Sequence, residues 1–119
     1  MNVKIYKFIN LDYMEMMSDG DNSMKKIMLE MLLEELPQEV KKMAELLDQN
    51  NWEMLGSVSH KMKSTLAFVG NEQMTNANKE IELLAKSSPA KEAIWELLNV
   101  LEKLYPMVVA ELEEENSKL

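Results

Sequence analysis

The chain has 119 residues and a formal net charge of −8, and 46% of its residues are hydrophobic. This length supports one domain with one core, and the absence of cysteine excludes disulfides and thiolate metal sites. The acidic net charge argues against nucleic acid as a partner. No apolar run reaches the length of a membrane span, and the lysine-interrupted N-terminus lacks a signal-peptide core. We therefore expect one cytoplasmic domain over residues 1–119 that contacts neither nucleic acid nor membrane.

Hydrophobic residues recur with helical periodicity through most of the chain, and only three glycines and three prolines interrupt it. The strand-type alternation at Val3 and Ile5 is weak, so the organisation is expected to be all-helical. In chain order, the expected elements are an N-terminal extension over 1–9, a short helix over 11–17, a long helix over 21–48, helices over 52–69 and 72–86, a last helix over 88–112, and a solvated or frayed acidic tail over 113–119.

Residues suited to capping mark several helix ends. Asp21 or Ser23 is expected to cap the start of the long helix, because their side-chain oxygens accept from free backbone N–H groups. Gly70 follows the histidine-containing helix and is expected to be its left-handed C-terminal cap. Ser88 as cap and Pro89 in the first turn are expected to start the last helix.

Four long amphipathic helices with short connections predict the fold. We expect an all-α protein, an up-and-down four-helix bundle with a short additional N-terminal helix. Pro37 lies inside the long helix, which therefore kinks or restarts there, and Pro106 is a second candidate kink. The twelve methionines are interpreted mainly as core residues, because many fall on inward stripes.

The histidine helix carries the most informative residue, because His60 is the only histidine in the chain. A helical wheel places the apolar stripe of this helix on one side and His60 nearly opposite to it. The same outer side is predicted to carry Gly56, Lys63, Ser64 and Ala67. Small neighbours leave the imidazole accessible to a large partner, and the cation stands one turn away.

A lone surface histidine is most often a solvated residue without a task. Two features favour a role for His60. A neutral imidazole offers a nucleophilic nitrogen near neutral pH, and the ammonium group of Lys63 is suited to holding phosphate oxygens. Lys61 lies in the same stretch, and no acidic residue occurs from 54 to 71, so this helix is a basic strip suited to an acidic partner or a phosphate. A chance gap in the acidic residues is the alternative.

His60, Lys63 and Gly70 resemble the His-x-x-Lys-(six residues)-Gly signature of histidine-containing phosphotransfer (HPt) domains. The chain departs from the family pattern at Ser64, where the family often has glycine, and at Leu66, which is bulkier than usual. The resemblance covers roughly residues 10–112, and the further positions that fit the layout of the family are Leu11-Asp12, Gly20-Asp21, the segment 33–37, Asn51-Trp52-Glu53 and Glu80-Ile81-Glu82.

The resemblance implies a phosphorelay carrier. His60 would accept a phosphoryl group from an aspartate of one receiver domain and pass it to another, and Lys63 would orient the phosphoryl oxygens. Because the helix would be approached around the histidine, the partner-docking face is expected to comprise Gly56, Lys61, Ser64 and Ala67.

The same resemblance implies the partners and cofactors. We expect receiver domains of response regulators, or a hybrid histidine kinase, as partners of a monomeric protein. Mg²⁺ is expected only on the receiver, and this chain needs no cofactor of its own. Because the sequence has no glycine-rich phosphate loop or nucleotide-binding signature, we expect a carrier and not an enzyme. Glu82 falls where the family often has a polar residue near the histidine, and we do not include it among the site residues.

Two other interpretations compete with the relay carrier. A histidine-kinase dimerisation helix has an acidic residue directly after the histidine and a proline shortly beyond, whereas Lys61 follows His60 here and no proline precedes Gly70. A helical interaction module of the same fold without phosphate stays open. Phe68 lies off the core stripe, and it either packs under the first short helix, which we favour, or belongs to an apolar docking surface.

Overall fold

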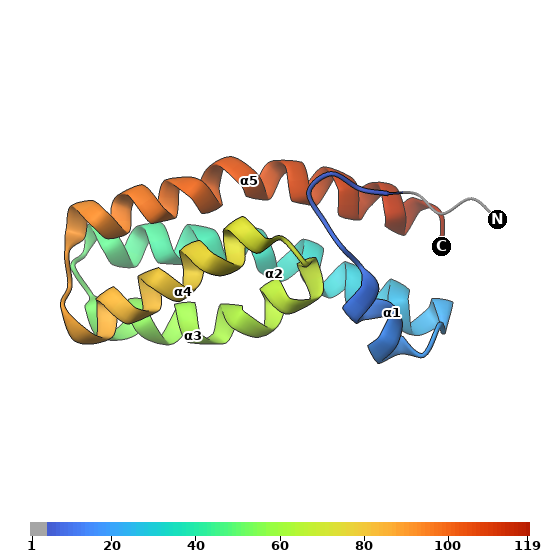
Figure 1. The fold of residues 1–119 in the computed structure, drawn as a ribbon, viewed down its shortest axis with the longest axis horizontal. Coiled ribbons are helices and arrows are strands. Elements are labelled where there is room, and N and C mark those ends of the chain that lie inside the picture. Colours follow the sequence, from blue (N-terminus) through green and yellow to red (C-terminus); the bar gives the residue numbers. More distant parts are fainter. Residues whose placement is uncertain (1–4) are drawn as a thin grey trace.

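A computed structural model describes residues 5–119, which contain helices and no strand. The candidate alternation at Val3 begins outside these residues. Figure 1 shows four long helices side by side along the long axis of the molecule and a short helix at one end, beside the first part of α2. The elements are α1 (Asp12–Ser18), α2 (Asn22–Asp48), α3 (Trp52–Val69), α4 (Glu72–Ser87) and α5 (Lys91–Ser117).

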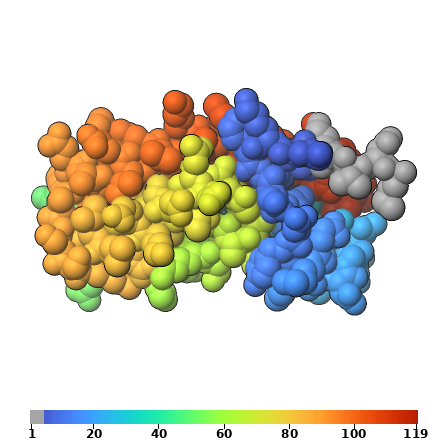
Figure 2. Space-filling model, viewed as in Figure 1, coloured from blue at the N-terminus to red at the C-terminus, as the bar shows by residue number. Residues whose placement is uncertain are grey.

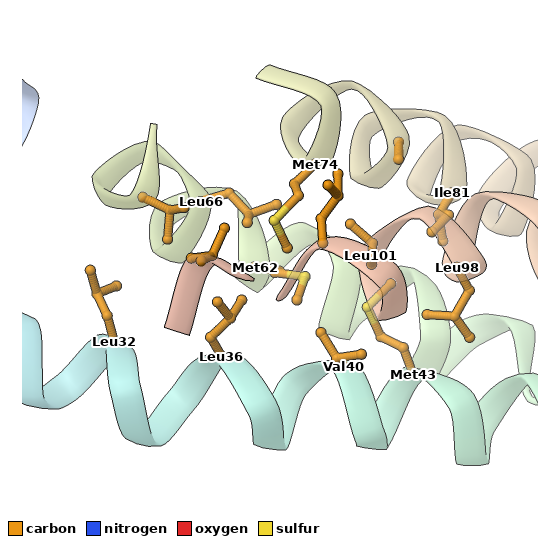
Figure 3. Close-up of a cluster of buried hydrophobic side chains, with 14 of the residues drawn as sticks. Leu32, Leu36, Val40, Met43, Met62, Leu66, Met74, Ile81, Leu98 and Leu101 are labelled. Carbon is orange, nitrogen blue, oxygen red and sulfur yellow. The ribbon is translucent and has the colours of Figure 1, made fainter. Parts of the chain in front are cut away.

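The long helices form the expected up-and-down four-helix bundle with a short additional N-terminal helix. Around the bundle, α2 packs on α3, α3 on α4, α4 on α5, and α5 on α2. The core consists of aliphatic and methionine side chains from all four helices (Figure 3). Its fully buried members include Leu29, Leu36, Met43, Leu55, Met62, Leu66, Met74, Ile81, Ile94, Leu98 and Leu101.

The methionines are less uniformly buried than expected. Met14, Met43, Met62 and Met74 are buried in the core. The interpretation as core filler is wrong for the others that follow, because they lie on the outward faces of their helices. Met16, Met17, Met24, Met31, Met54 and Met107 are exposed.

Side-chain caps explain where three helices begin. The Asp21 carboxylate accepts from the backbone N–H groups of Ser23 and Met24, so Asp21 is the N-cap of α2. The amide oxygens of Asn51 and Asn71 accept in the same way at the starts of α3 and α4. The bounds of α3 agree with the sequence prediction, since this helix covers 52–69.

The last helix begins later than expected. Its N-cap is Ala90, and Lys91 is its first residue. The backbone N–H of Ser88 donates to the carbonyl of Leu84, which continues the hydrogen-bond pattern of α4. Ser88 therefore ends α4, and the prediction that Ser88 and Pro89 start α5 is wrong. Both other prolines lie within continuous helices, so α2 does not restart at position 37.

The segment before α1 packs against the last turns of α5, as Figures 1 and 2 show. The Glu111 carboxylate accepts from three consecutive backbone N–H groups, those of Lys7, Phe8 and Ile9, at 2.7–3.1 Å. Ile9 is buried in the core. The described part of the predicted N-terminal extension is therefore a packed element and not a loose arm.

Most of the acidic tail over 113–119 is exposed, as expected for a solvated segment, and most of it is helical. The helix α5 continues to Ser117. The hydroxyl of Tyr6 donates to Glu115 Oε1 at 2.7 Å, and Asn116 is half-buried. Contacts with the N-terminal segment hold this last turn in place, and local charge patterning alone does not reveal them.

Gly70 joins the N-terminal segment to the turn between α3 and α4. Its φ of 71° lies in the left-handed region, as predicted for a C-cap. A Cβ at this position would overlap the carbonyl oxygen of Asn10. The N–H of Asn10 donates to the carbonyl of Val69 at 3.0 Å, so the segment passes directly over the end of α3. Gly70 is thus required for close backbone contact as well as for the turn.

A buried polar pair connects α2 with α3. The Thr65 hydroxyl donates to Glu39 Oε1 at 2.8 Å, and Glu39 is only 9% exposed. The second carboxylate oxygen, Oε2, has no hydrogen-bond partner among the described residues. Burial raises the pKa of Glu39, although the hydrogen bond from Thr65 opposes this shift. An ionised Glu39 therefore costs stability at neutral pH.

We predict that Glu39→Gln raises the free energy of unfolding at pH 7 by about 1 kcal/mol, because the amide oxygen keeps the Thr65 bond and no unpaired charge is buried. The raised pKa makes folded Glu39 bind its proton more readily than the unfolded chain does. The parent should therefore gain stability as the pH falls through the raised folded pKa toward the unfolded value, and the variant should lose this dependence. Urea unfolding at several pH values measures both effects.

The exposed residue Glu34 on the same helix provides the control, because Glu34→Gln changes the net charge by the same amount. A loss of stability at pH 7 in Glu39→Gln, or an unchanged pH dependence, would contradict this account of Glu39.

Candidate functional site

His60 lies on the outer face of α3 with its side chain 65% exposed. Its Nδ1 atom is 2.7 Å from Oε2 of Glu82 on α4. The described residues offer no hydrogen-bond partner to the other ring nitrogen, Nε2. The imidazole is therefore fixed through one nitrogen and accessible through the other.

Glu82 is the centre of the site, although its side chain is only 9% exposed. Lys63 of α3 donates to Oε1 at 2.7 Å, and Lys86 of α4 donates to Oε2 at 2.6 Å. The hydrogen bonds from Lys63 and then Lys86 lower the pKa of Glu82 to about 2, against the opposing effect of burial. Glu82 is thus an ionised carboxylate at neutral pH.

The charge of Glu82 decides which nitrogen of His60 carries the hydrogen. An ionised carboxylate can only accept hydrogen bonds, so Nδ1 of His60 must donate to it. In the neutral ring the hydrogen then resides on Nδ1, and Nε2 keeps its lone pair. The arrangement presents a nucleophilic nitrogen at the exposed edge of the ring.

A second buried pair sets the register between α3 and α4. The Ser59 hydroxyl lies 2.8 Å from the backbone oxygen and from Oδ1 of Asn78, and the Asn78 amide donates to the backbone oxygen of Ser59 at 2.9 Å. Ser59 is 0% exposed and Asn78 is 1% exposed. Ser59 directly precedes His60, and Asn78 lies one turn before Glu82, so this pair holds the two site residues opposite each other.

The predicted docking face is largely, but not wholly, on the outside. Lys61, Ser64 and Ala67 are exposed. Gly56 is buried against α4, where a Cβ would lie 3.1 Å from Cγ of Lys86, so its predicted place on the outer side of α3 is wrong. The wheel of α3 alone could not show that α4 covers this edge of the helix.

Phe68 packs against α1, as favoured from the sequence. Its ring centroid lies 5.1 Å from that of Tyr13, and Phe68 is half-buried. Met14 of the same short helix is 0% exposed and anchors α1 on the bundle. The aromatic pair therefore ties the end of α3 to α1 beside the docking face.

The sequence-based site left out two residues, Glu82, which was considered and not included, and Lys86, which was missed. Their spacing of four residues is a readable signal for an ion pair within one helix. The contact between Glu82 and His60 was not readable from this spacing, because it depends on the register of α3 against α4. The buried Ser59–Asn78 pair that fixes this register was missed as well.

Among residues 5–119, the structure contains neither a candidate metal cluster nor a candidate membrane span. No group of three or more histidine, cysteine, aspartate or glutamate side chains is arranged to hold a metal ion. No helix in this range is long and apolar enough to cross a membrane.

Comparison with known proteins identifies the family. The sequence model of the Hpt domain matches residues 27–115. The fold matches the crystal structure of the HPT domain of an Hpt sensor hybrid histidine kinase from Shewanella with a TM-score of 0.71 and 28% identity, over 93% of this chain and 95% of that one. Among curated protein sequences, none matches. The chain belongs to the Hpt domain family, the histidine phosphotransfer domains of phosphorelay signalling.

Proposed function

We propose that His60 is the residue that carries the phosphoryl group in this protein. The observation behind the proposal is the bond between Nδ1 of an exposed imidazole and the ionised carboxylate of Glu82. A phosphoryl acceptor needs an accessible lone pair, and this bond leaves Nε2 as the nitrogen that has one. Membership of the Hpt family supports the same assignment, since His60 is the only histidine in the chain.

The transfer follows from this geometry. Nε2 of His60 attacks the phosphorus of an aspartyl phosphate in a receiver domain, so that an N–P bond forms and the O–P bond to the aspartate breaks. The aspartate leaves as a carboxylate, and the Nδ1 hydrogen stays in place. The imidazole ring becomes cationic, and Glu82 at 2.7 Å compensates that charge. Transfer to the next receiver is the reverse reaction with another aspartate.

Lys63 is proposed to neutralise the phosphoryl oxygens. It lies one turn after His60 with its side chain 51% exposed, so it can turn toward a group on Nε2. Mg²⁺ would be held by the carboxylates of the receiver and would offset the charge on the transferred group.

The proposed partners are receiver domains of response regulators or of a hybrid histidine kinase, met by a cytoplasmic monomer. They would approach the exposed face formed by Lys61, Ser64 and Ala67. An in-line attack requires the aspartyl phosphate to come into van der Waals contact with Nε2, so the receiver must lie close against α3.

We predict that His60→Gln abolishes labelling by a phosphorylated receiver, because glutamine offers no nucleophilic ring nitrogen. Since the side chain is largely exposed, the free energy of unfolding should change by less than about 1 kcal/mol. Acid-labile phosphate on the isolated chain, measured together with urea unfolding, checks both statements. Labelling of the variant would disprove the assignment, and no labelling of the parent by any receiver would leave a non-phosphorylated interaction module.

Lys63→Ala is expected to shorten the lifetime of the phosphohistidine without preventing its formation. An exposed cation near a phosphate is worth about 1 kcal/mol, which corresponds to about a five-fold change in rate. Decay of label after removal of the receiver measures the lifetime. An unchanged lifetime and transfer rate would show that Lys63 is only a partner of Glu82.

Ser64→Phe tests the docking face. Ser64 is exposed one turn after His60, so a bulky ring should block the receiver while leaving the melting temperature near that of the parent. A small donor such as acetyl phosphate, if it labels the parent, should label the variant equally well. The matched control is Asn76→Phe, an exposed position on α4. Normal exchange between Ser64→Phe and the receiver would contradict the proposed approach.

A further inference from the structure

The two lysines at Glu82 hold different oxygens of the same carboxylate. Lys63 binds Oε1 at 2.7 Å, whereas Lys86 binds Oε2 at 2.6 Å. His60 also bonds to Oε2. Departure of Lys63 would therefore leave the contact among Lys86, Oε2 and the imidazole in place.

The proposed function requires Lys63 to leave Glu82. In the unphosphorylated protein its ammonium group is bound to Oε1, and it cannot fully serve the phosphoryl oxygens while it stays there. Glu82 is only 9% exposed, and a buried charge without a partner is strongly unfavourable. Without Lys86, the carboxylate would have only Lys63 and the ring of His60 as partners and would hold that lysine more strongly.

We propose that Lys86 is a positioning residue that remains on Glu82 as its counter-ion and so releases Lys63 to the phosphoryl group on His60. This inference rests on the proposed function and adds a division of roles between the two cations. Lys86 stays bonded to Oε2 of Glu82, beside Nδ1 of His60, so that the carboxylate remains paired while it compensates the charge that the ring gains. Lys63, which lies on the same helix as His60, is the cation that moves.

Gly56 makes the position of Lys86 possible. The Lys86 side chain crosses the surface of α3 at Gly56, where an added Cβ would lie 3.1 Å from its Cγ and 3.4 Å from its Cε. A large side chain at this position would fill the path that the lysine takes to Oε2. The glycine one turn before His60 thus serves the counter-ion and not the docking partner.

The other charged group in this region does not share the role. Lys79 lines the same shallow hollow of about 290 Å³ as Lys63, Glu82 and Lys86. It forms no ion pair with Glu82, which His60, Lys63 and Lys86 contact. Lys79→Met therefore removes one positive charge from the hollow without removing a partner of the carboxylate, which makes it the matched control.

The first experiment needs no phosphate. The ¹³C signal of the Glu82 carboxyl is followed from pH 7 to pH 3 in the parent and in Lys86→Met, Lys86→Arg and Lys79→Met. The parent should stay ionised over this range, since its pKa is about 2. In Lys86→Met, the Glu82 carboxyl should begin to take up a proton within this pH range. Lys86→Arg and Lys79→Met should behave as the parent does. An unchanged signal in Lys86→Met would overturn the assignment of Lys86 as counter-ion, whether or not His60 accepts phosphate.

The second experiment measures the phosphohistidine lifetime in a double-mutant cycle of Lys63→Ala and Lys86→Met. In the parent background, Lys63→Ala should shorten the lifetime about five-fold. With Lys86→Met the same change should have less than about a two-fold effect, because Lys63 is then already held at Glu82. In a Gly56→Leu background, Lys63→Ala should have the same small effect on the lifetime as in Lys86→Met. In a Lys79→Met background, its effect should be as large as in the parent.

Equal effects of Lys63→Ala in both backgrounds would overturn the inference, because the two lysines would then act independently. Failure of Gly56→Leu to fold would not decide the matter, because Lys86→Met carries the test without a change in α3. A parent that accepts no phosphate at all would instead refute the proposed function, and the carboxyl titration would still report whether Lys86 pairs with Glu82.

Discussion

The Ser59–Asn78 pair is the contact on which the geometry of the site depends. Both side chains are buried, and each satisfies polar groups of the opposite helix. A slip of one residue between α3 and α4 would leave these groups unpaired in the core, which is costly for buried polar atoms. Because His60 and Glu82 follow on the same two helices, their distance is set by this buried pair and not by their own attraction.

The surface around His60 is rich in positive charge, although the molecule as a whole is acidic. The chain has a net charge of −8, yet the face around His60 carries Lys61, Lys63 and Lys86. Glu82, the carboxylate that contacts His60, is bonded to two of these lysines and to the imidazole. A dianionic phosphoryl group would meet a locally positive surface, while the rest of the acidic surface disfavours nonspecific contact with other acidic molecules.

The sequence predicted most of what depends on local periodicity and capping. The bounds of α3, the cap at Gly70 and the exposure of His60 all follow from the wheel and from glycine chemistry. The predictions that were wrong depend on neighbours distant in the chain. Gly56 is exposed on an isolated wheel but is covered by α4, and the partnership of Glu82 with His60 spans 22 residues.

The C-terminal tail and the boundary between α4 and α5 also depend on contacts that a local sequence pattern does not show. The tail, expected to be solvated or frayed, is contacted by Tyr6, and no local pattern predicts this hydrogen bond to Glu115. Ser88 looked like the start of a helix because serine often caps one, but its N–H completes the preceding helix. The residue types near position 88 do not determine whether Ser88 ends α4 or starts α5.

The bonds from Glu111 to Lys7, Phe8 and Ile9 also bear on the order of folding. They join residues 102–104 positions apart, so each closes a loop of nearly the whole chain. Loop closure over such a span is entropically costly until the intervening helices have packed. During synthesis the segment can bond to the end of α3 through Asn10 and Val69, but the N–H groups of Lys7, Phe8 and Ile9 have no Glu111 carboxylate until α5 leaves the ribosome. These contacts with α5 are therefore among the last to form.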